Sequence, residues 1–322
     1  MVKIAFHTEI IDIRGSCVAV YDYAHYNESI LNNKSIIVVP ITSITQNRND
    51  DIAVTKYMES FQVYFYNDKD DLQTFLQQQK CDIFYSIKFG KNDGMVFDNI
   101  KNVVHCVFEM IEPHGQVYAA VSQQIANKYN QTLFVPHMIG LKPSTTKENL
   151  RNKLNIPENA VVFGRYGGSD TFNIDFCHSV ILRLVEETDE RYFIFINTPV
   201  FCKPHPHIIH LPKIVSEYDK NRFICTTDAH LECSNFGQSF GLSCGEFSVN
   251  NKPIICYNGW TWNQSHFQII GDKAIKFKTE DEFYDILKNF NPKDYENKDN
   301  NCYREFSPEN VMEKFNKIFI DG

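Results

Sequence analysis

The residues that are best suited to bind a ligand lie in the range 237–253, which reads Gly-Gln-Ser-Phe-Gly-Leu-Ser-Cys-Gly-Glu-Phe-Ser-Val-Asn-Asn-Lys-Pro. Its apolar spacing fits one buried face of a helix that opens after a small, turn-forming segment and stops before Pro253. Glu246, two turns into the helix, can reach a diol. The helix dipole favours a phosphate at the helix start, on the backbone N–H groups of Ser239, Phe240, Gly241 and Leu242. Phosphate and diol together describe a nucleotide site, although an ordinary buried helix with a solvated glutamate fits equally well.

Two further glycine turns follow expected strands. In the range 160–170 an apolar strand runs into Gly164-Arg165-Tyr166-Gly167-Gly168, where backbone can wrap a phosphate and Arg165 can neutralise it with a forked donor. The same residues also fit a tight strand-to-helix turn without a ligand. Near the N-terminus, Gly15 lies between a strand and a helix and would let backbone approach a ligand closely.

The histidines separate into structural and functional candidates by their surroundings. His105 lies inside an apolar strand and is expected to be structural, whereas His114 lies in the loop Glu-Pro-His-Gly that ends this strand segment. Because open α/β sheets carry ligands at the carboxyl ends of their strands, His114 is a candidate site residue. His205 and His207 alternate with prolines and fit an exposed loop better than a metal site.

Composition excludes several classes of protein. The 322 residues, 43% of them hydrophobic, can form two domains of ordinary size. A formal net charge of −8 argues against a general affinity for nucleic acid or anionic membranes. We expect no signal peptide and no transmembrane segment, since no run approaches the roughly 20 apolar residues of a membrane span. The ten scattered cysteines favour a reduced, cytoplasmic protein with neither a zinc site nor a disulfide framework.

The elements that must position these residues alternate between strands and helices, which predicts α/β sheets with parallel strands. A first domain, 1–143, is expected to hold strands at 3–8, 35–40, 61–66, 82–87, 103–108 and 132–136. A polar, proline-bearing stretch then marks the boundary, and Thr145 and Glu148 are spaced as a capping box for a helix through Leu150 and Leu154. The second domain is 144–305, and 306–322 is a closing helix.

The segment from Gln238 to Glu246 with Asn-Lys-Pro-Ile-Ile after it resembles the E-x7-E segment of retaining glycosyltransferases of family 4. This family has the GT-B fold, two Rossmann-like domains that face each other across a cleft, and its final helix crosses back to the first domain. Gly164-Arg165 matches the pair that holds the donor diphosphate in the family. The sequence departs from the family at Gln238, which replaces an acid, and where Thr171 or a neighbour replaces a lysine.

The resemblance implies transfer of a hexosyl or similar sugar, with retention of configuration and without a metal, from a nucleotide-sugar donor in the second domain to an acceptor in the first. A UDP- or GDP-sugar is the implied donor, and a glycan, glycoprotein or other hydroxyl compound is the acceptor, with no further cofactor. The implied catalytic residues are His114, Gln238 and Arg165. Donor binding falls to Gly15, Gly164, Arg165, Ser239, Phe240, Gly241, Leu242 and Glu246. The Asn-, Ile- and Lys-rich composition is typical of AT-rich genomes, including those of large DNA viruses that encode such enzymes.

Two alternatives belong to other classes. The missing acid and lysine would also suit a non-catalytic nucleotide-sugar or carbohydrate-binding protein with a degenerate GT-B site. A nicotinamide-dependent oxidoreductase is disfavoured because neither glycine loop has the GxGxxG spacing.

Overall fold

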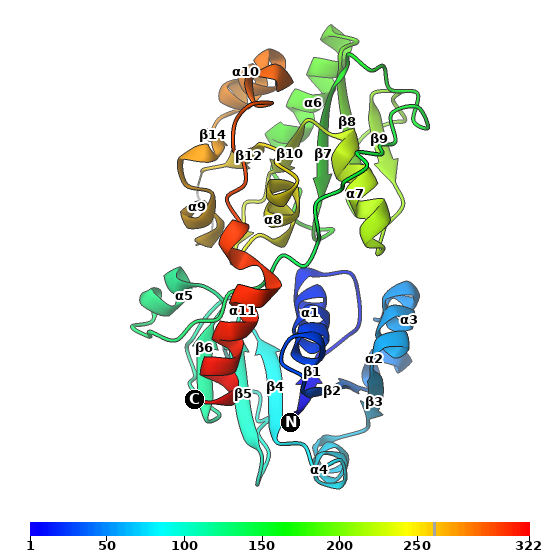
Figure 1. The fold of residues 1–322 in the computed structure, drawn as a ribbon. Coiled ribbons are helices and arrows are strands. Elements are labelled where there is room, and N and C mark those ends of the chain that lie inside the picture. The colour runs from blue at the N-terminus through cyan, green and yellow to red at the C-terminus, as the bar shows by residue number, and fades with distance from the viewer. Residues whose placement is uncertain (260–261) are drawn as a thin grey trace. The chain divides into compact units, whose positions relative to one another are not determined.

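The structure, a computed structural model, describes residues 1–259 and 262–322. The chain forms two compact units, and Figure 1 shows each as a sheet covered by helices. Unit 1 comprises Met1–Gly140 together with Phe306–Gly322, and unit 2 comprises Leu141–Glu305. The first division falls three residues before the position that the sequence suggests.

Unit 1 is built on a six-stranded sheet of order β3-β2-β1-β4-β5-β6, in which every pair of neighbouring strands is parallel. The central strands are nearly continuous runs of apolar residues because helices cover both faces of the sheet. Its strands are β1 (Lys3–His7), β2 (Lys34–Pro40), β3 (Gln62–Tyr66), β4 (Ile83–Lys88), β5 (Lys101–Cys106) and β6 (Val117–Ala120). Its helices are α1 (Gly15–Ser29), α2 (Thr42–Thr45), α3 (Asp51–Ser60), α4 (Lys69–Gln78), α5 (Gln123–Lys128) and α11 (Pro308–Phe315), the last followed by a π-helical turn (Asn316–Ile320).

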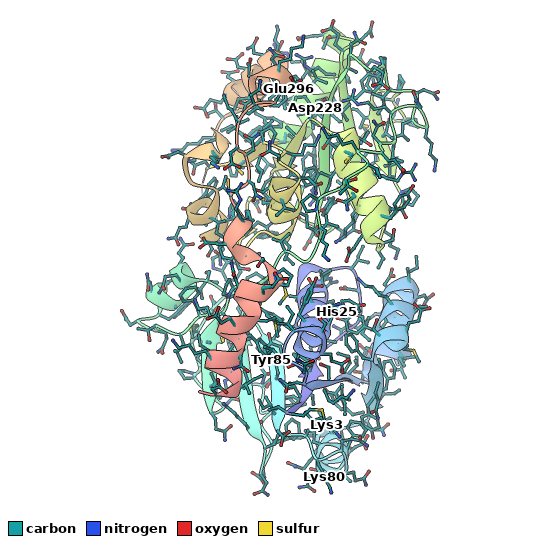
Figure 2. The ribbon with its side chains drawn as sticks, viewed as in Figure 1. Lys3, His25, Lys80, Tyr85, Asp228 and Glu296 are labelled. Carbon is teal, nitrogen blue, oxygen red and sulfur yellow. The ribbon has the colours of Figure 1, made fainter. Side chains whose placement is uncertain are left out.

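The closing helix α11 belongs to the core of unit 1. The ring of Phe315 lies 5.2 Å from that of Tyr23 and 5.5 Å from that of Tyr85, which Figure 2 labels in β4. Ser307 caps the helix through the backbone N–H of Asn310, and Pro308 occupies its first turn. Phe315 is fully buried, so α11 completes the apolar core on one face of the sheet.

Unit 2 repeats this architecture with a second parallel six-stranded sheet, of order β14-β12-β10-β7-β8-β9. Its strands are β7 (Val161–Tyr166), β8 (Arg191–Ile196), β9 (Ile208–Leu211), β10 (Ala229–Glu232), β12 (Ile254–Tyr257) and β14 (Ile275–Phe277), with a separate short pair β11 (Gly237–Gln238) and β13 (Asn263–Gln264). Its helices are α6 (Asp175–Glu187), α7 (Glu217–Thr226), α8 (Leu242–Val249), α9 (Ser265–Ile270) and α10 (Glu280–Asn289), with 3₁₀ turns at Gly271–Lys273, Pro292–Asp294 and Arg304–Phe306.

The two faces of the second sheet have different chemistry. Ala229 and Leu231 pack with α6 and α10 in one apolar cluster. Because side chains alternate along a strand, His230 and Glu232 point to the opposite face, where α8 contacts β10. This polar face continues into the candidate site.

Two expectations about elements are wrong. The range 132–136 is not a strand, since it makes an isolated bridge between Ala120 and Phe134, and Pro136 has no N–H with which to extend the pairing. The sixth strand is instead β6, which follows the His114 loop directly.

The helix expected through Leu150 and Leu154 is also absent, and these residues form turns. The guanidinium of Arg151 donates to the carbonyl oxygens of Pro157, Glu158 and Ala160, at 3.2, 3.2 and 2.8 Å. It also donates to the carboxylate of Asp228, labelled in Figure 2, at 2.9 Å. These contacts with the chain that enters β7 and β10 fold the segment back on itself and outweigh its helical pattern.

Candidate functional site

The carboxyl ends of β7 and β10 form the topological switch point of the second sheet. From β7 the chain continues to β8 and β9 on one side, and it returns to the other side at β10. Connections that leave two adjacent strands in opposite directions open a crevice at their carboxyl ends, where α/β sheets bind ligands. Tyr166 is the last residue of β7 and Glu232 the last of β10, so both lie at this edge.

Arg165 braces the glycine loop from inside. Its side chain is buried and donates hydrogen bonds to the hydroxyls of Thr198 and Thr171 and, at 2.8 Å, to the carbonyl of Gly168. Burial lowers the pKa of its guanidinium from the ordinary value. Thr171 therefore serves as an acceptor for Arg165. The predicted contact between Arg165 and a phosphate stays a prediction.

Gly164 lies inside β7 and packs against Thr227, which precedes β10. A Cβ atom at this position would lie 2.2 Å from Cγ2 of Thr227, far inside van der Waals contact. The glycine thus permits close packing between β7 and the turn that precedes β10. The predicted contact between Gly164 and a nucleotide-sugar donor stays a prediction.

Glu246 is buried in the second turn of α8 and carries two hydrogen bonds. It accepts one from the hydroxyl of Tyr166 and another from Nζ of Lys220, on α7, at 2.7 Å. Burial raises the pKa of Tyr166 well above its usual range, so the phenol stays a donor. Neither partner is among the residues that the sequence singles out. Tyr166 directly follows Gly164-Arg165, whereas nothing in the sequence around Lys220 connects it to Glu246.

Helix α8 begins at a glycine in the left-handed conformation. Gly241 has φ +85° and offers no capping side chain, so the first amide N–H groups of α8 form the positive end of its dipole. Of the other predicted phosphate-binding residues, Leu242 opens the helix, Ser239 is partly exposed and Phe240 is buried. An anion above Gly241 would therefore meet backbone donors, as the sequence predicts.

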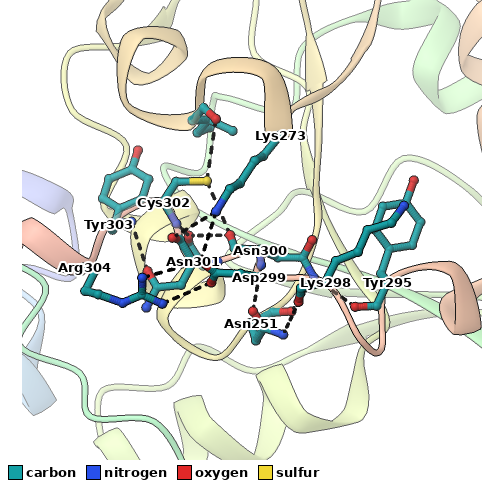
Figure 3. A network of polar contacts seen from close by, with 12 residues as sticks. Asn251, Lys273, Tyr295, Lys298, Asp299, Asn300, Asn301, Cys302, Tyr303 and Arg304 are labelled. Carbon is teal, nitrogen blue, oxygen red and sulfur yellow. Dashed lines mark hydrogen bonds and ion pairs between the residues drawn. The ribbon is translucent and has the colours of Figure 1, made fainter.

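A polar network holds this glycine from the C-terminal side of unit 2. Figure 3 shows the network around Asn251 and the range 298–304, in which Asn251 Oδ1 accepts from the backbone N–H of Asn300 at 2.8 Å. Asp299 in the same segment pairs with Lys273 and Arg304. The network presents Tyr303, whose hydroxyl donates to the carbonyl of Phe240 at 2.8 Å. The loop before α8 is thus fixed by a residue that is distant in sequence, since Tyr303 and Phe240 lie 63 positions apart.

Gln238 faces a carboxylate that the sequence does not assign. Its Nε2 donates to Oε1 of Glu232 at 3.1 Å, and burial raises the pKa of this carboxyl group. The backbone of Gln238 pairs with Gln264 between β11 and β13, which fixes the loop that carries it. The structure therefore places a carboxyl group, that of Glu232, next to the neutral side chain of Gln238.

Unit 1 has its own switch point, between β1 and β4. Lys88 ends β4, and its Nζ lies 3.2 Å from Nε2 of His114 and 2.5 Å from the carboxylate of Asp93. The other ring nitrogen of His114 lies 2.6 Å from the carbonyl of Glu112. His114 is predicted from the sequence, but Lys88 is not, because it is the last residue of a largely apolar strand.

Two further features complete the edge of unit 1. His7 ends β1 and is buried against the hydroxyl of Tyr66 at 2.9 Å, and burial lowers its pKa to about 4. Gly15 opens α1 at an exposed position, and Arg14 before it provides no side-chain cap. His105, in contrast, bonds to Tyr85 and Val135 deep inside the unit and is structural.

Other candidate features lie away from both edges. A cavity of about 600 Å³ near β9 is lined by none of the predicted site residues, although His205 borders it. All ten cysteines are unpaired. Within residues 1–259 and 262–322, no helix has the length and apolar character needed to cross a membrane.

Comparison with known proteins identifies the fold. No protein-family model matches the chain, and no curated protein sequence matches it. Among solved structures, a glycosyltransferase from Rickettsia africae aligns with 100% of this chain and 99% of its own, at 10% identity and a TM-score of 0.70. HepE from Anabaena, solved in complex with UDP-glucose, aligns over 99% of this chain and 96% of its own, at 12% identity and a TM-score of 0.69. TarM aligns over 99% of both chains, at 9% identity and a TM-score of 0.68.

These alignments extend over both units and match the topology of both sheets, so the fold is GT-B with two Rossmann-like units, as expected from the sequence. At identities near 10% the likeness defines the fold alone.

Proposed function

We propose that the protein is a glycosyltransferase that moves a sugar from a nucleoside-diphosphate donor to a hydroxyl acceptor. The observation that carries the proposal is the edge of unit 2, where the ends of β7 and β10 meet the start of α8. The first amides of α8 are backbone donors there, and Glu246 is held by Tyr166, the residue that follows Arg165. Structural neighbours that are glycosyltransferases, including HepE bound to UDP-glucose, support the choice of donor.

In this proposal the parts of unit 2 have separate roles. The first amides of α8 bind the diphosphate, and the field of Arg165 stabilises the charge that develops on it as the sugar leaves. Glu246 binds the ribose hydroxyls, and its bonds to Tyr166 and Lys220 fix the carboxylate in place. Gln238 contacts the sugar and remains anchored on Glu232.

Unit 1 supplies the acceptor side of the reaction. The switch point between β1 and β4 is the natural place for the acceptor, and His114 is its candidate catalytic residue. Lys88 donates toward Nε2, so the neutral ring donates from Nδ1 to the carbonyl of Glu112, and this arrangement fixes the tautomer. Gly15, at the start of α1, is instead assigned to the donor, to which its backbone N–H can donate.

The finer assignments follow from the sequence resemblance and are part of the proposal. They are membership of a family 4-like group, retention of anomeric configuration and independence from a catalytic metal. An origin in a large DNA virus is proposed on the Asn-, Ile- and Lys-rich composition alone. The ten unpaired cysteines support a reducing compartment such as the cytoplasm. Proton NMR of the first product formed from an α-linked donor would show an α-linkage if configuration is retained.

The proposal is tested by calorimetry of UDP and GDP binding in the presence of a chelator. We expect one of them to bind, and Arg165→Ala and Glu246→Ala each to weaken binding by about ten- to a hundredfold, the loss of a charge-assisted contact. Glu186→Ala, which removes an exposed carboxylate on α6, is the matched control. Unchanged affinity in both site variants would remove the nucleotide from this edge.

A non-catalytic binding protein is the second candidate, favoured by the neutral Gln238 and by the internal use of Arg165. The two candidates differ in turnover. A binding protein would bind the nucleotide sugar at this edge yet release no free sugar in a hydrolysis assay at high protein concentration.

A further inference from the structure

A second cluster lies beneath the donor edge, on the face of the sheet that α8 covers. His230 and Glu232 are alternate residues of β10, and Cys244 faces them from the first turn of α8. One ligand atom from each residue, an imidazole nitrogen, a carboxylate oxygen and a thiol sulfur, lies within 4.8 Å of the other two. All three side chains are buried.

The orientation of His230 is fixed by its inner nitrogen. Nδ1 lies 3.2 Å from the carbonyl oxygen of Gly164, so Nδ1 must carry the proton and donate it. Nε2 then presents a lone pair, and it has no hydrogen-bond partner among the residues that the structure describes. A backbone carbonyl on one imidazole nitrogen and a bare lone pair on the other is the arrangement that metal-binding histidines use.

Nε2 of His230 faces a second acceptor, the carboxylate of Glu232, and no donor from the described residues lies between the two. The nearest oxygen of Glu232, Oε2, is 3.9 Å from Nε2, which is beyond hydrogen-bond distance even if the carboxyl group carries a proton. The other carboxylate oxygen is held by Gln238 at 3.1 Å. Two buried acceptors that face each other at this separation leave room for a cation between them.

We propose that His230, Glu232 and Cys244 form a zinc site that ties β10 to the first turn of α8. Nitrogen, oxygen and sulfur ligands together suit zinc. Zinc bonds of about 2.0–2.3 Å place tetrahedral ligand atoms roughly 3.5 Å apart, so small side-chain rotations close the present distances. The ion would fix the α8 start from below and takes no part in the reaction proposed above.

Neighbouring groups fit this site. Cys256 pairs with Glu232 across β10 and β12, so its thiol lies on the same face of the sheet, close to Cys244. The positive charge of Arg165 acts on Glu232 and opposes a second cation. A carboxylate and a thiolate offset it, because both ligands are anionic when bound.

The proposal is tested on the wild-type protein and two serine variants. Elemental analysis should find one zinc ion per chain, and cobalt added after chelation should give a thiolate-to-cobalt charge-transfer band. Cys244→Ser should lose the band. Cys177→Ser, which changes another buried thiol of unit 2 on α6, should keep it.

Absence of zinc together with absence of the band in the wild-type protein would overturn the proposal, as would a band that persists in Cys244→Ser. The elemental analysis does not depend on whether the serine variant folds. Metal content is measured without any sugar donor, so failure of the zinc site and failure of the transferase proposal are separate results.

Discussion

At the scale of single residues, several charged groups at the candidate site are engaged within the protein itself. Glu246 accepts from Tyr166 and Lys220, and Arg165 donates to the loop that follows β7. Such partners hold a side chain in one orientation before a ligand arrives, which lowers the entropy lost on binding. Substitutions here therefore act on the position of a group as well as on its charge.

Gln238 is the most informative residue to substitute. Gln238→Glu would place a second carboxylate about 3 Å from Glu232, the separation of the present hydrogen bond, and near the donor diphosphate. We expect this variant to weaken binding of the donor, whereas Gln238→Ala should mainly lower the rate by misplacing the sugar. Titration calorimetry and initial rates separate these effects, and Asn235→Asp controls for a carboxylate added elsewhere on the loop. If Gln238→Glu instead transfers the sugar several-fold faster than the wild type, the natural protein is a decayed enzyme.

His114 provides a test for unit 1. Because this residue lies in unit 1 and the nucleotide is assigned to unit 2, His114→Ala should lower kcat strongly and leave the Kd for the nucleotide nearly unchanged. His25→Ala, an exposed histidine of α1 labelled in Figure 2, is the control. Equal turnover of the His114 variant and the control would return His114 to a structural role.

His105 predicts how the stability of unit 1 depends on pH. Burial lowers its pKa to about 4, from 6.5, and its ring faces Tyr23, Tyr85 and His137. Between these pH values the unfolded chain binds more protons than the folded unit, so stability is complete above pH 6.5 and falls as the pH drops toward 4. A shift of this size corresponds to about 3 kcal/mol. Denaturation curves should show a shallower pH dependence for His105→Gln than for the wild type, and parallel dependences would contradict the assignment.

At the scale of elements, the start of α8 depends on a backbone conformation that glycine adopts readily. Gly241 has φ +85°, and a Cβ atom there would lie 3.0 Å from the hydroxyl of Tyr303 and 3.2 Å from Cβ of His266. The network in Figure 3 presents Tyr303, so the helix start is fixed jointly by conformation and by packing.

Gly241→Ala should therefore lose both stability and nucleotide affinity. The left-handed backbone costs about 1–3 kcal/mol for a residue with a side chain, and the contact with Tyr303 adds to this cost. Gly94→Ala is the matched control, because Gly94 also has positive φ but a Cβ there would meet nothing within 4 Å. Chemical denaturation and calorimetry should show a stability loss in both variants and a loss of nucleotide binding in Gly241→Ala alone. Equal binding by both would separate the α8 start from the ligand.

At the scale of the whole molecule, the chain leaves unit 1, forms unit 2 and returns to finish unit 1. The returning segment buries Val311, Met312, Phe315 and Phe319, each at most 2% exposed. Complete burial of such side chains contributes about 1.5–3 kcal/mol each, a sum comparable with the whole stability of a domain of about 5–15 kcal/mol. Unit 1 thus depends on residues that follow unit 2 in the chain.

Deletion of residues 307–322 should unfold unit 1, whereas deletion of Asp321 and Gly322, both exposed, should have little effect. Hydrogen exchange reports each unit separately. In the longer deletion, amides of β4 and β5 should exchange rapidly while those of β7 and β8 remain protected. Protection of β4 and β5 equal to that of the full chain would show that the core of unit 1 forms without α11.

The sequence by itself determined the local patterns. Apolar runs between glycine turns located most strands, because a strand buried on both faces must be apolar, and the capped, striped segment after Ser307 located α11. The start of α8 after Gly241 was also readable, since it depends on neighbouring residues. Local pattern failed at 132–136, where Pro136 has no N–H with which to extend the pairing. It also failed at Leu150–Leu154, where Arg151 binds Ala160 at the start of β7 and the distant Asp228.

The tertiary structure decided which side chains meet. Lys220 reaches Glu246 across 26 positions, Lys88 reaches His114 across the same separation, and His230 and Glu232 of β10 meet Cys244 of α8. None of these pairs has a short spacing that a sequence pattern could reveal. Parallel sheets bring the carboxyl ends of strands far apart in sequence to one edge, so the chemistry gathered there depends on strand order, which pairing between distant segments establishes.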